Sequence, residues 1–349
     1  MKSDAGVTAL ESAKYQCTAE LRPLGAEGAF EIRVESGVPM EYVTLQSGAT
    51  VDILDSSESN SALNQQVRSE LFRFQAILHC VGFTTQKIKL KLRTSEGHGG
   101  HLHVHVLPHG PCKVVRAFAL ELKPLSLHTR VLEPPIPAGA LSEIRVTGSF
   151  SQLDFHSWVM AALPEVPPQM EEGEIAFRSS FVGSVLLLRY EKGSASVRSD
   201  SLSTLTIFKD VLLQQASRRK VQIDFSTSLE PDSVYSILHL LQPQLDHAHQ
   251  LNKDFRTLEA LQELQMAGEE AQEFLQDPRH QQLLLRAEKV RQEHAQQPRK
   301  LNFLFSVISD LYVDRSKVVG RPYEKALGQL KGLFAHYSFE KILAFFQDN

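Results

Sequence analysis

Between Tyr15 and Leu127 the chain repeatedly alternates apolar and polar residues, and this alternation restricts that part of it to β structure. The runs include AFEIRVES, EYVTLQS, QKIKLKLR and HLHVHVL, and turn-forming clusters such as SGVP and SEGHGG separate them. Side chains on a strand point alternately to its two sides, so each run can bury one side and expose the other. Seven or eight such strands within roughly 110 residues predict an immunoglobulin-like β-sandwich over residues 15–129.

A different pattern follows the proline-rich stretch RVLEPPIPAGALS, which predicts a linker at residues 130–142. In residues 143–230 the segments EIRVTGSF, GEIAFRSSF, SVLLLRYEK, SASVRS and VQIDFSTSL predict strands, and LSTLTIFKDVLLQQASRRK predicts a helix. SQLDFHSWVMAAL predicts another helix with Ser151 as its N-cap. Its inward-facing residues are expected to be Leu153, Trp158, Val159 and Leu163. Together these elements predict a small α+β domain.

From residue 231 to residue 349 apolar residues recur every three or four positions, which predicts helices. Pro231, Pro278 and Pro298 each suit the first turn of a helix, with Asp277 as the N-cap before the second of them. An apolar stripe on one of these helices consists of Leu251, Phe255, Leu258, Leu261 and Leu264. The opposite face is mixed in charge rather than basic, so we expect the stripe to pack in a helical bundle rather than on a membrane. A partner helix could share it.

Charge, hydropathy and cysteine usage limit the classes of function. The 349 residues carry a formal net charge of -4 and contain no apolar run near the roughly 20 residues that span a bilayer. This balance argues against a nucleic-acid-binding protein, which normally has a strong basic excess. The N-terminus lacks the apolar core of a signal peptide and the three cysteines show no CxxC spacing, so we expect a reducing, cytoplasmic location.

Motifs for catalysis or cofactor binding are missing from the sequence. It has no GxxxxGK[ST], HExxH or GxSxG, and GHGGHL does not fit the GxGxxG pattern. Acidic pairs lie in loop-like segments without a predicted pocket around them. We therefore assign no catalytic residue, no cofactor and no resident metal, and we expect a protein that is not an enzyme.

One segment, SEGHGGHLHVHVLPHGPC, gathers five of the fourteen histidines. In HLHVHVL the alternate apolar residues are expected to face the core, which places His101, His103 and His105 together on the outer side. Imidazoles at alternate strand positions are one arrangement that binds zinc. A metal-binding or metal-regulated protein that uses the segment His98–His109 is therefore the alternative function.

The preceding strand, KIKLKLR, alternates in the same way and is expected to expose Lys87, Lys89, Lys91 and Arg93. If the two strands pair as a hairpin, these four cations and the three histidines share one face. Positive charge there disfavours a bound dication. The seven residues then form a tentative surface for an anionic partner, such as an acidic peptide or a lipid headgroup. The plainer interpretation is a solvated strand that its lysines protect from aggregation.

Several segments resemble, in order and spacing, the C-terminal part of the Bardet-Biedl syndrome 7 family, whose members are subunits of the BBSome. They are YVTLQSGATVDILDSSESNSA, LKLRTSEGHGG, ALELKPLSLHTRV, VTGSFSQLDFHSWVMAALPEVP, SLSTLTIFKDVLLQQASRRKVQI and ISDLYVDRSKVVGR. The resemblance implies a multidomain chain: a γ-adaptin-ear-like sandwich at 15–129, a platform-like α+β domain at 143–230 and a helical region at 231–349. It implies no enzymatic activity. Histidines at the three strand positions are not typical of the family, so a metal function would be peculiar to this chain.

The resemblance also implies a role, namely a non-catalytic scaffold subunit of a coat-like complex that moves membrane proteins into and out of cilia and supports cilium assembly. The implied partners are other BBSome subunits, especially the Bardet-Biedl syndrome 2 and 9 proteins, and ciliary membrane cargo, with peripheral membrane contact through the complex. The implied locations are the cytoplasm, the basal body and centriolar satellites, the cilium and its membrane. Longer family members carry an N-terminal β-propeller and a coiled coil. We therefore expect a fragment, a short isoform or a partial gene model, with residues 1–14 as a tail or coiled-coil remnant.

Overall fold

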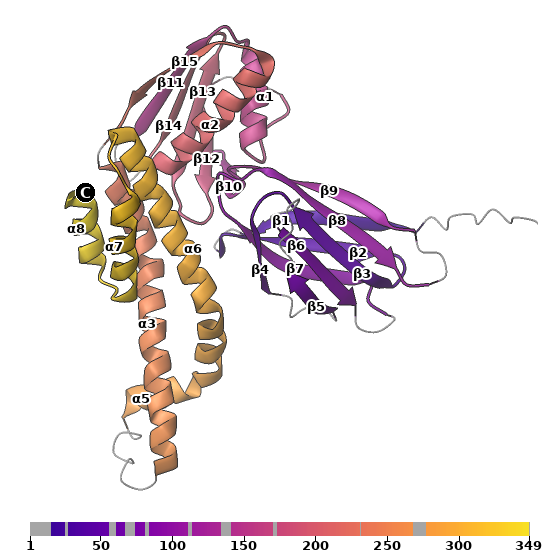
Figure 1. The fold of residues 1–349 in the computed structure, drawn as a ribbon, viewed down its shortest axis with the longest axis vertical. Helices are drawn as coiled ribbons and strands as arrows, with labels where there is room; N and C mark the ends of the chain where they lie inside the picture. The colour runs from indigo at the N-terminus through magenta and orange to yellow at the C-terminus, as the bar shows by residue number, and fades with distance from the viewer. Residues whose placement is uncertain are drawn as a thin grey trace, which may run out of the picture. The chain divides into compact units, whose positions relative to one another are not determined.

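The computed structural model divides the chain into two compact units (Figure 1). One unit comprises residues 1–127 and 161–164, and the other comprises residues 128–160 and 165–349. The structure describes residues 15–24, 27–55, 61–66, 74–80, 84–110, 114–133, 141–169, 173–230, 232–267 and 277–348. The predicted tail at 1–14 lies outside these ranges. Within them, no helix combines the length and the apolar character needed to cross a bilayer.

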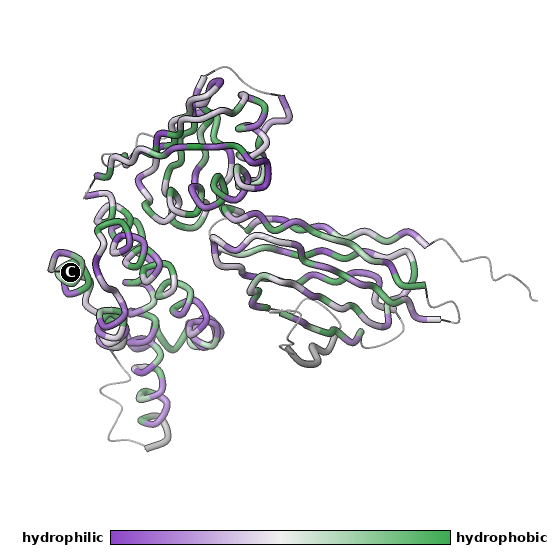
Figure 2. Tube along the Cα trace, turned by 45° about the horizontal axis from the view of Figure 1, so that its top comes forward, coloured by the Kyte–Doolittle hydropathy of each residue, from purple (hydrophilic) through white to green (hydrophobic). Residues whose placement is uncertain are grey.

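The described residues of the first unit form nine strands in two antiparallel sheets. The first sheet has the order β1-β2-β7-β4, with bounds Cys17–Leu24, Ala29–Ser36, Lys87–Thr94 and Val51–Asp55. The second has the order β5-β6-β3-β8-β9, with bounds Ser61–Gln66, Phe74–Cys80, Met40–Ser47, Gly100–Pro108 and Arg116–Leu122. Hydrophobic and hydrophilic residues alternate along these strands (Figure 2). Both sheets contribute to one buried core, for example Ile32 and Leu90 from the first and Val43 and Val104 from the second.

This arrangement confirms the predicted immunoglobulin-like sandwich. The alternation did not identify β4 and β5, because VDILD and SALNQQ span only five and six residues, too few for a clear period-two pattern. The buried set is continuous between the sheets, as expected where two sheets pack face to face with their inward side chains in contact.

The second unit begins with a six-stranded antiparallel sheet of order β10-β12-β13-β14-β11-β15. The strands are His128–Val131, Ile175–Ser179, Val185–Glu191, Ser194–Ser199, Ser142–Gly148 and Ile223–Ser228. Helices α1 (Gln152–Ala162) and α2 (Leu202–Arg219) lie on one side of the sheet (Figure 1). Trp158 of α1 is fully buried, and its ring contacts Phe155 at a centroid distance of 5.8 Å. The predicted α+β domain is therefore confirmed, with an aromatic cluster at its centre.

Two details of this domain differ from prediction. Arg130 and Val131, placed in the linker, belong to β10 and pair with β12. A strand of four residues is too short for alternation to reveal it, and residues 134–140 of the predicted linker lie outside the described residues. Leu153 was predicted to face inward and is 66% exposed, whereas Trp158, Val159 and Leu163 are buried as expected. Phe155, two residues after Leu153, faces inward instead. A step of two residues turns roughly 200° around the helix axis, so the two side chains point to opposite sides of α1.

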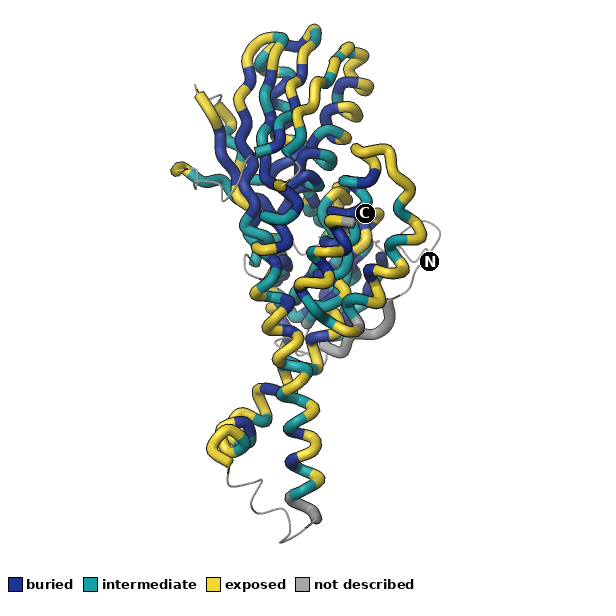
Figure 3. Tube along the Cα trace, turned by 90° about the vertical axis from the view of Figure 1, so that its left-hand side faces the viewer, coloured by how far each residue is buried: buried dark blue, intermediate teal, exposed yellow. Residues whose placement is uncertain are grey.

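The remaining elements are helices α3 (Ser233–Ala267), α5 (Pro278–Leu285), α6 (Ala287–Val319), α7 (Glu324–Ala335) and α8 (Phe339–Asp348). Helices α3 and α6 run beside each other (Figure 1), and buried and exposed residues alternate in short steps along α3 (Figure 3). The stripe on α3 is covered: Leu258 and Leu261 pack with Leu283 of α5 and Val290 of α6. The prediction that this stripe packs inside a helical bundle is confirmed.

The prolines behave differently from one another. Asp277 caps α5 as predicted, because its Oδ1 accepts a hydrogen bond from the Arg279 backbone N–H at 2.8 Å and Pro278 follows it. Pro298 does not begin a helix; it lies inside α6. An interior proline removes one backbone hydrogen bond, and here buried side chains near it, such as Gln297 and Phe303, tie the helix to its neighbours. Pro231 lies outside the described residues.

The helical region is attached to the α+β domain by aromatic and polar contacts. The ring of Phe181, which follows β12, meets the ring of Phe303 in α6 edge to face, with centroids 4.8 Å apart. Gln244 of α3 donates from Nε2 to the backbone carbonyl of Phe181 at 3.2 Å. Phe181 thus touches both long helices, which makes it a central residue of this interface.

Candidate functional site

The two strands that were expected to form one cationic face do not pair. β7 lies between β2 and β4 in the first sheet, and β8 lies between β3 and β9 in the second. Lys87, Lys89, Lys91 and Arg93 therefore line the outer side of one sheet, and His101, His103 and His105 line the outer side of the other. The predicted hairpin is wrong, because alternation shows which side of a strand faces the core but not which strand is its neighbour. The buried core separates the two rows.

Carboxylates accompany the lysine row. In the register of β2 and β7, Glu35 stands opposite Lys87 and Glu31 stands opposite Lys91. Lys87 Nζ lies 3.2 Å from Glu35 Oε1, and Lys91 Nζ lies 3.2 Å from Glu27 Oε2. Exposed pairs of this kind stabilise a fold by at most about 1 kcal/mol each. Their effect on binding is larger, because each neighbouring carboxylate reduces the positive potential that an anionic partner would meet.

In the strand register the histidine row has one charged residue opposite it, because Glu121 of β9 pairs with His101 while His103 and His105 pair with uncharged residues. The rings of His101 and His103 stack at a centroid distance of 6.1 Å, and His105 Nδ1 lies 3.3 Å from Thr44 Oγ1. His79 of β6, which sequence reasoning did not include, lies on the same outer face, where its ring meets Tyr42 at 4.9 Å. The signal that could have identified it is the alternation of FQAILHC, which places His79 on the side opposite the core.

The geometry gives the metal-binding alternative no support. Within the part of the chain that the structure describes, no three His, Cys, Asp or Glu side chains are grouped as a metal ion requires. His98 and His109 lie beyond the two opposite ends of β8. His109 instead faces Glu41, with Nδ1 4.0 Å from Oε2.

The two described cysteines sit in unreactive surroundings. Cys80 is buried in the sandwich core, and burial raises the pKa of its thiol to about 11. Cys17 packs at the edge of the same core, and burial raises its pKa as well. A thiol that stays protonated is a poor nucleophile and a poor metal ligand. Cys112 lies outside the described residues.

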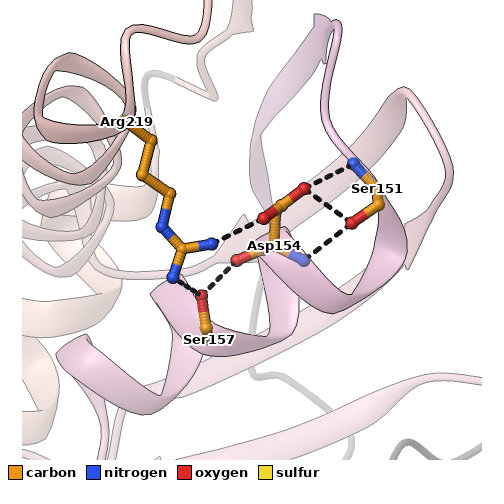
Figure 4. A network of polar contacts seen from close by, with 4 residues as sticks. All are labelled: Ser151, Asp154, Ser157 and Arg219. Carbon is orange, nitrogen blue, oxygen red and sulfur yellow. Dashed lines mark hydrogen bonds and ion pairs between the residues drawn. The ribbon is translucent and has the colours of Figure 1, made fainter.

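A polar network joins the two helices of the α+β domain (Figure 4). Ser151 Oγ accepts a hydrogen bond from the Asp154 backbone N–H at 3.1 Å, and Asp154 Oδ2 accepts from the Ser151 backbone N–H at 3.0 Å. Arg219, in the last turn of α2, donates to Asp154 Oδ1 at 2.6 Å and to Ser157 Oγ at 2.8 Å. The reciprocal bonds form a capping box, which the letters SQLD already contain. Hydrogen bonds from Ser151 and then the Arg219 charge lower the pKa of the Asp154 carboxyl. The network holds α1 to α2 rather than a ligand.

A two-sheet sandwich, an α+β domain and a pair of long helices with shorter ones define a multidomain protein of β, α+β and α regions in that order. Models of the BBS7 GAE domain, the BBS7 platform domain and the BBS7 hairpin match residues 16–119, 128–228 and 231–346. The chain belongs to the BBS7 family.

Two curated relatives show the same likeness along nearly the whole chain. The chain is 30% identical over 341 residues to the Mus musculus protein named BBSome complex member BBS7, and 24% identical over 336 residues to the Caenorhabditis elegans protein named BBSome complex member bbs-7. These alignments cover 96% and 93% of this chain and 45% of each relative. The chain thus spans a little under half the length of the relatives it matches.

Proposed function

We propose that this chain is a non-catalytic scaffold subunit of the BBSome. The observation that carries the proposal is the series of three BBS7 domain matches, at residues 16–119, 128–228 and 231–346, which follow the same order as the three regions of the structure. Both relatives are named as BBSome complex members. A chain built from several separately matched domains suits a role in holding other proteins together.

The proposal extends to partners and location. The expected partners are the other BBSome subunits, foremost the Bardet-Biedl syndrome 2 and 9 proteins, and ciliary membrane proteins carried as cargo. The chain would act in the cytoplasm, at the basal body and centriolar satellites and in the cilium, and would meet the ciliary membrane through the complex. Its contribution would be to trafficking and cilium assembly.

A chimera tests membership directly, because the chain corresponds to only part of its relatives. The matching segment of the mouse relative is replaced by residues 15–349, and the tagged chimera is expressed together with the remaining mouse subunits. Recovery of the subunits that the unaltered mouse relative recovers supports the proposal. A chimera that is folded, as judged by circular dichroism, and that recovers none of them overturns it.

Metal analysis of the purified chain separates the scaffold function from the metal-binding alternative. The scaffold function predicts substoichiometric metal in both the wild-type chain and His103→Ala. One zinc per chain that is lost in His103→Ala would establish the alternative.

A further inference from the structure

The helical region contains a groove that sequence reasoning did not identify. It measures about 620 Å³ and lies between one face of α3, Leu301 of α6 and the corner between α7 and α8. His249, Lys253 and Arg256 of α3 line it at helical steps of three and four, so they point to the same side. The corner supplies Phe334, His336 and Tyr337.

The fixed charges on the groove lining are both positive and belong to Lys253 and Arg256. Its lining includes Lys253, Arg256, His249 and His336, and it includes no aspartate or glutamate. Lys253 and Arg256 are exposed, and neither forms an ion pair with a carboxylate of the described residues. This contrasts with Lys87 and Lys91 of the sandwich, which stand beside glutamates. Unneutralised cations in a hollow attract anionic groups more strongly than the same cations on a flat surface.

Two carboxylates close to the groove, Asp246 and Asp254, accept hydrogen bonds from neighbouring side chains. Asp254 accepts a hydrogen bond from Gln250 Nε2 at 2.6 Å. Asp246 accepts one from the Tyr337 hydroxyl at 2.5 Å, which fixes the tyrosine at one end of the groove. The Tyr337 ring also contacts His249 at a centroid distance of 5.3 Å. These contacts hold Tyr337 in one position at that end of the groove.

The floor of the groove is apolar. Leu245 is buried, and Leu301 and Phe334 are half-buried with part of their surface open to the groove. Phe334 is held from behind by Phe305, whose ring meets it edge to face at 5.1 Å. An apolar floor below a cationic rim matches a peptide in which carboxylates flank one large apolar side chain. Two fixed cations are too few for an extended polyanion such as nucleic acid, which needs many phosphate contacts.

We propose that the groove between α3, α6 and the α7–α8 corner binds an acidic peptide segment of a partner protein. The apolar side chain of the peptide rests on Leu301 and Phe334, and its carboxylates face Lys253 and Arg256. The site belongs to the surface of the helical region itself, so the inference does not rest on the proposed function.

The test uses the full chain and fluorescence polarisation of a labelled peptide, Glu-Glu-Phe-Glu-Glu. Two control peptides change one element each: Gln-Gln-Phe-Gln-Gln removes the charge, and Glu-Glu-Ala-Glu-Glu removes the apolar anchor. We expect only the first peptide to bind well, and its binding to weaken as salt is added. The double variant Lys253→Glu, Arg256→Glu should bind it about tenfold more weakly or worse, since two attractive contacts become repulsive.

A matched variant controls for net charge. Lys325→Glu, Lys331→Glu makes the same charge change at two exposed positions of α7 that do not line the groove, and it should bind the peptide like the wild-type chain. Equal loss in both double variants would overturn the inference, as would equal binding of all three peptides. Displacement of the peptide by inorganic phosphate at similar concentration would reveal a small-anion site and also overturn it. A further outcome would also overturn the inference: the chain binds phosphatidylserine vesicles through Lys253 and Arg256 but does not bind the peptide.

Discussion

Arg219 Nη1 and Asp154 Oδ1 lie 2.6 Å apart, and this contact joins the last turn of α2 to the first turn of α1 (Figure 4). The cation stands at the C-terminal end of one helix and the carboxylate at the N-terminal end of the other. Each charge therefore has a favourable interaction with its own helix dipole as well as with its partner.

This contact predicts how stability depends on pH. The pKa of Asp154 is lowered in the folded state, so its ionised form stabilises the fold. That stabilisation is complete above the ordinary aspartate pKa of about 3.9 and is lost as the pH falls through the lowered value. Between about pH 5 and pH 2 the wild-type chain should therefore lose more free energy of unfolding than Asp154→Asn.

Urea denaturation at a series of pH values measures this difference. The other carboxylates titrate alike in both proteins, so the difference between the two curves isolates Asp154. Arg219→Gln, which keeps the bonds from Ser151, should fall between them. Parallel curves for the wild-type chain and Asp154→Asn would contradict the interpretation.

Phe303 is predicted to be essential for attaching the helical region to the α+β domain. Its ring is buried against Phe181, so Phe303→Ala should lower the free energy of unfolding by about 3 kcal/mol or more. Leu285→Ala is the control, because Leu285 is 87% exposed and its loss should change stability by less than about 0.5 kcal/mol. Chemical denaturation followed by circular dichroism compares the two. Equal effects would show that the Phe181–Phe303 contact does not stabilise the unit.

Gly148, at the end of β11, is predicted to tolerate no side chain. A Cβ built there would meet the backbone oxygen of Gln222, and backbone atoms cannot move aside cheaply. Gly148→Ala should therefore lower the midpoint of thermal unfolding. Gly328→Ala in α7 meets nothing nearby and should raise stability by roughly 0.5–1 kcal/mol, because alanine favours the helix. A neutral Gly148→Ala would disprove the close approach of these two backbone segments.

The separation of the lysine and histidine rows can be tested by a double-mutant cycle. Lys89 of β7 and His103 of β8 point outward from different sheets, which pack about 10 Å apart. The effects of Lys89→Ala and His103→Ala on the free energy of unfolding should add within about 0.5 kcal/mol. In a hairpin the lysine and histidine rows would be adjacent. Removing one positive group would then relieve electrostatic repulsion on the other, and the two effects would not add. A coupling energy clearly above about 0.5 kcal/mol would support the hairpin.

Local patterns identified most elements because they depend on neighbours in the sequence. The alternation in QKIKLKLR determines that Ile88 and Leu90 are buried, whatever strand lies beside them. Asp277 followed by Pro278 predicted a helix start correctly, since a cap bonds to a backbone group two residues away. The stripe around Leu258 and Leu261 predicted a buried helix face for the same reason.

The failures concern relationships between distant residues. Pro298 remains inside α6 because packing outweighs the local cost of a proline, and that packing involves residues from other helices. The groove beside Lys253 and Arg256 of α3 also needs Leu301 of α6 and Phe334 of α7, which are distant from them in the sequence.

The sequence by itself determined which side of most strands and helices faces a core, the order of the three regions and the family. Only the tertiary structure decided that β7 and β8 belong to opposite sheets, and that the histidines therefore stand apart from the lysines. The physical reason is that periodicity encodes the direction of a side chain relative to its own backbone. The partner of a strand is chosen by the free energy of the whole core, to which every strand contributes.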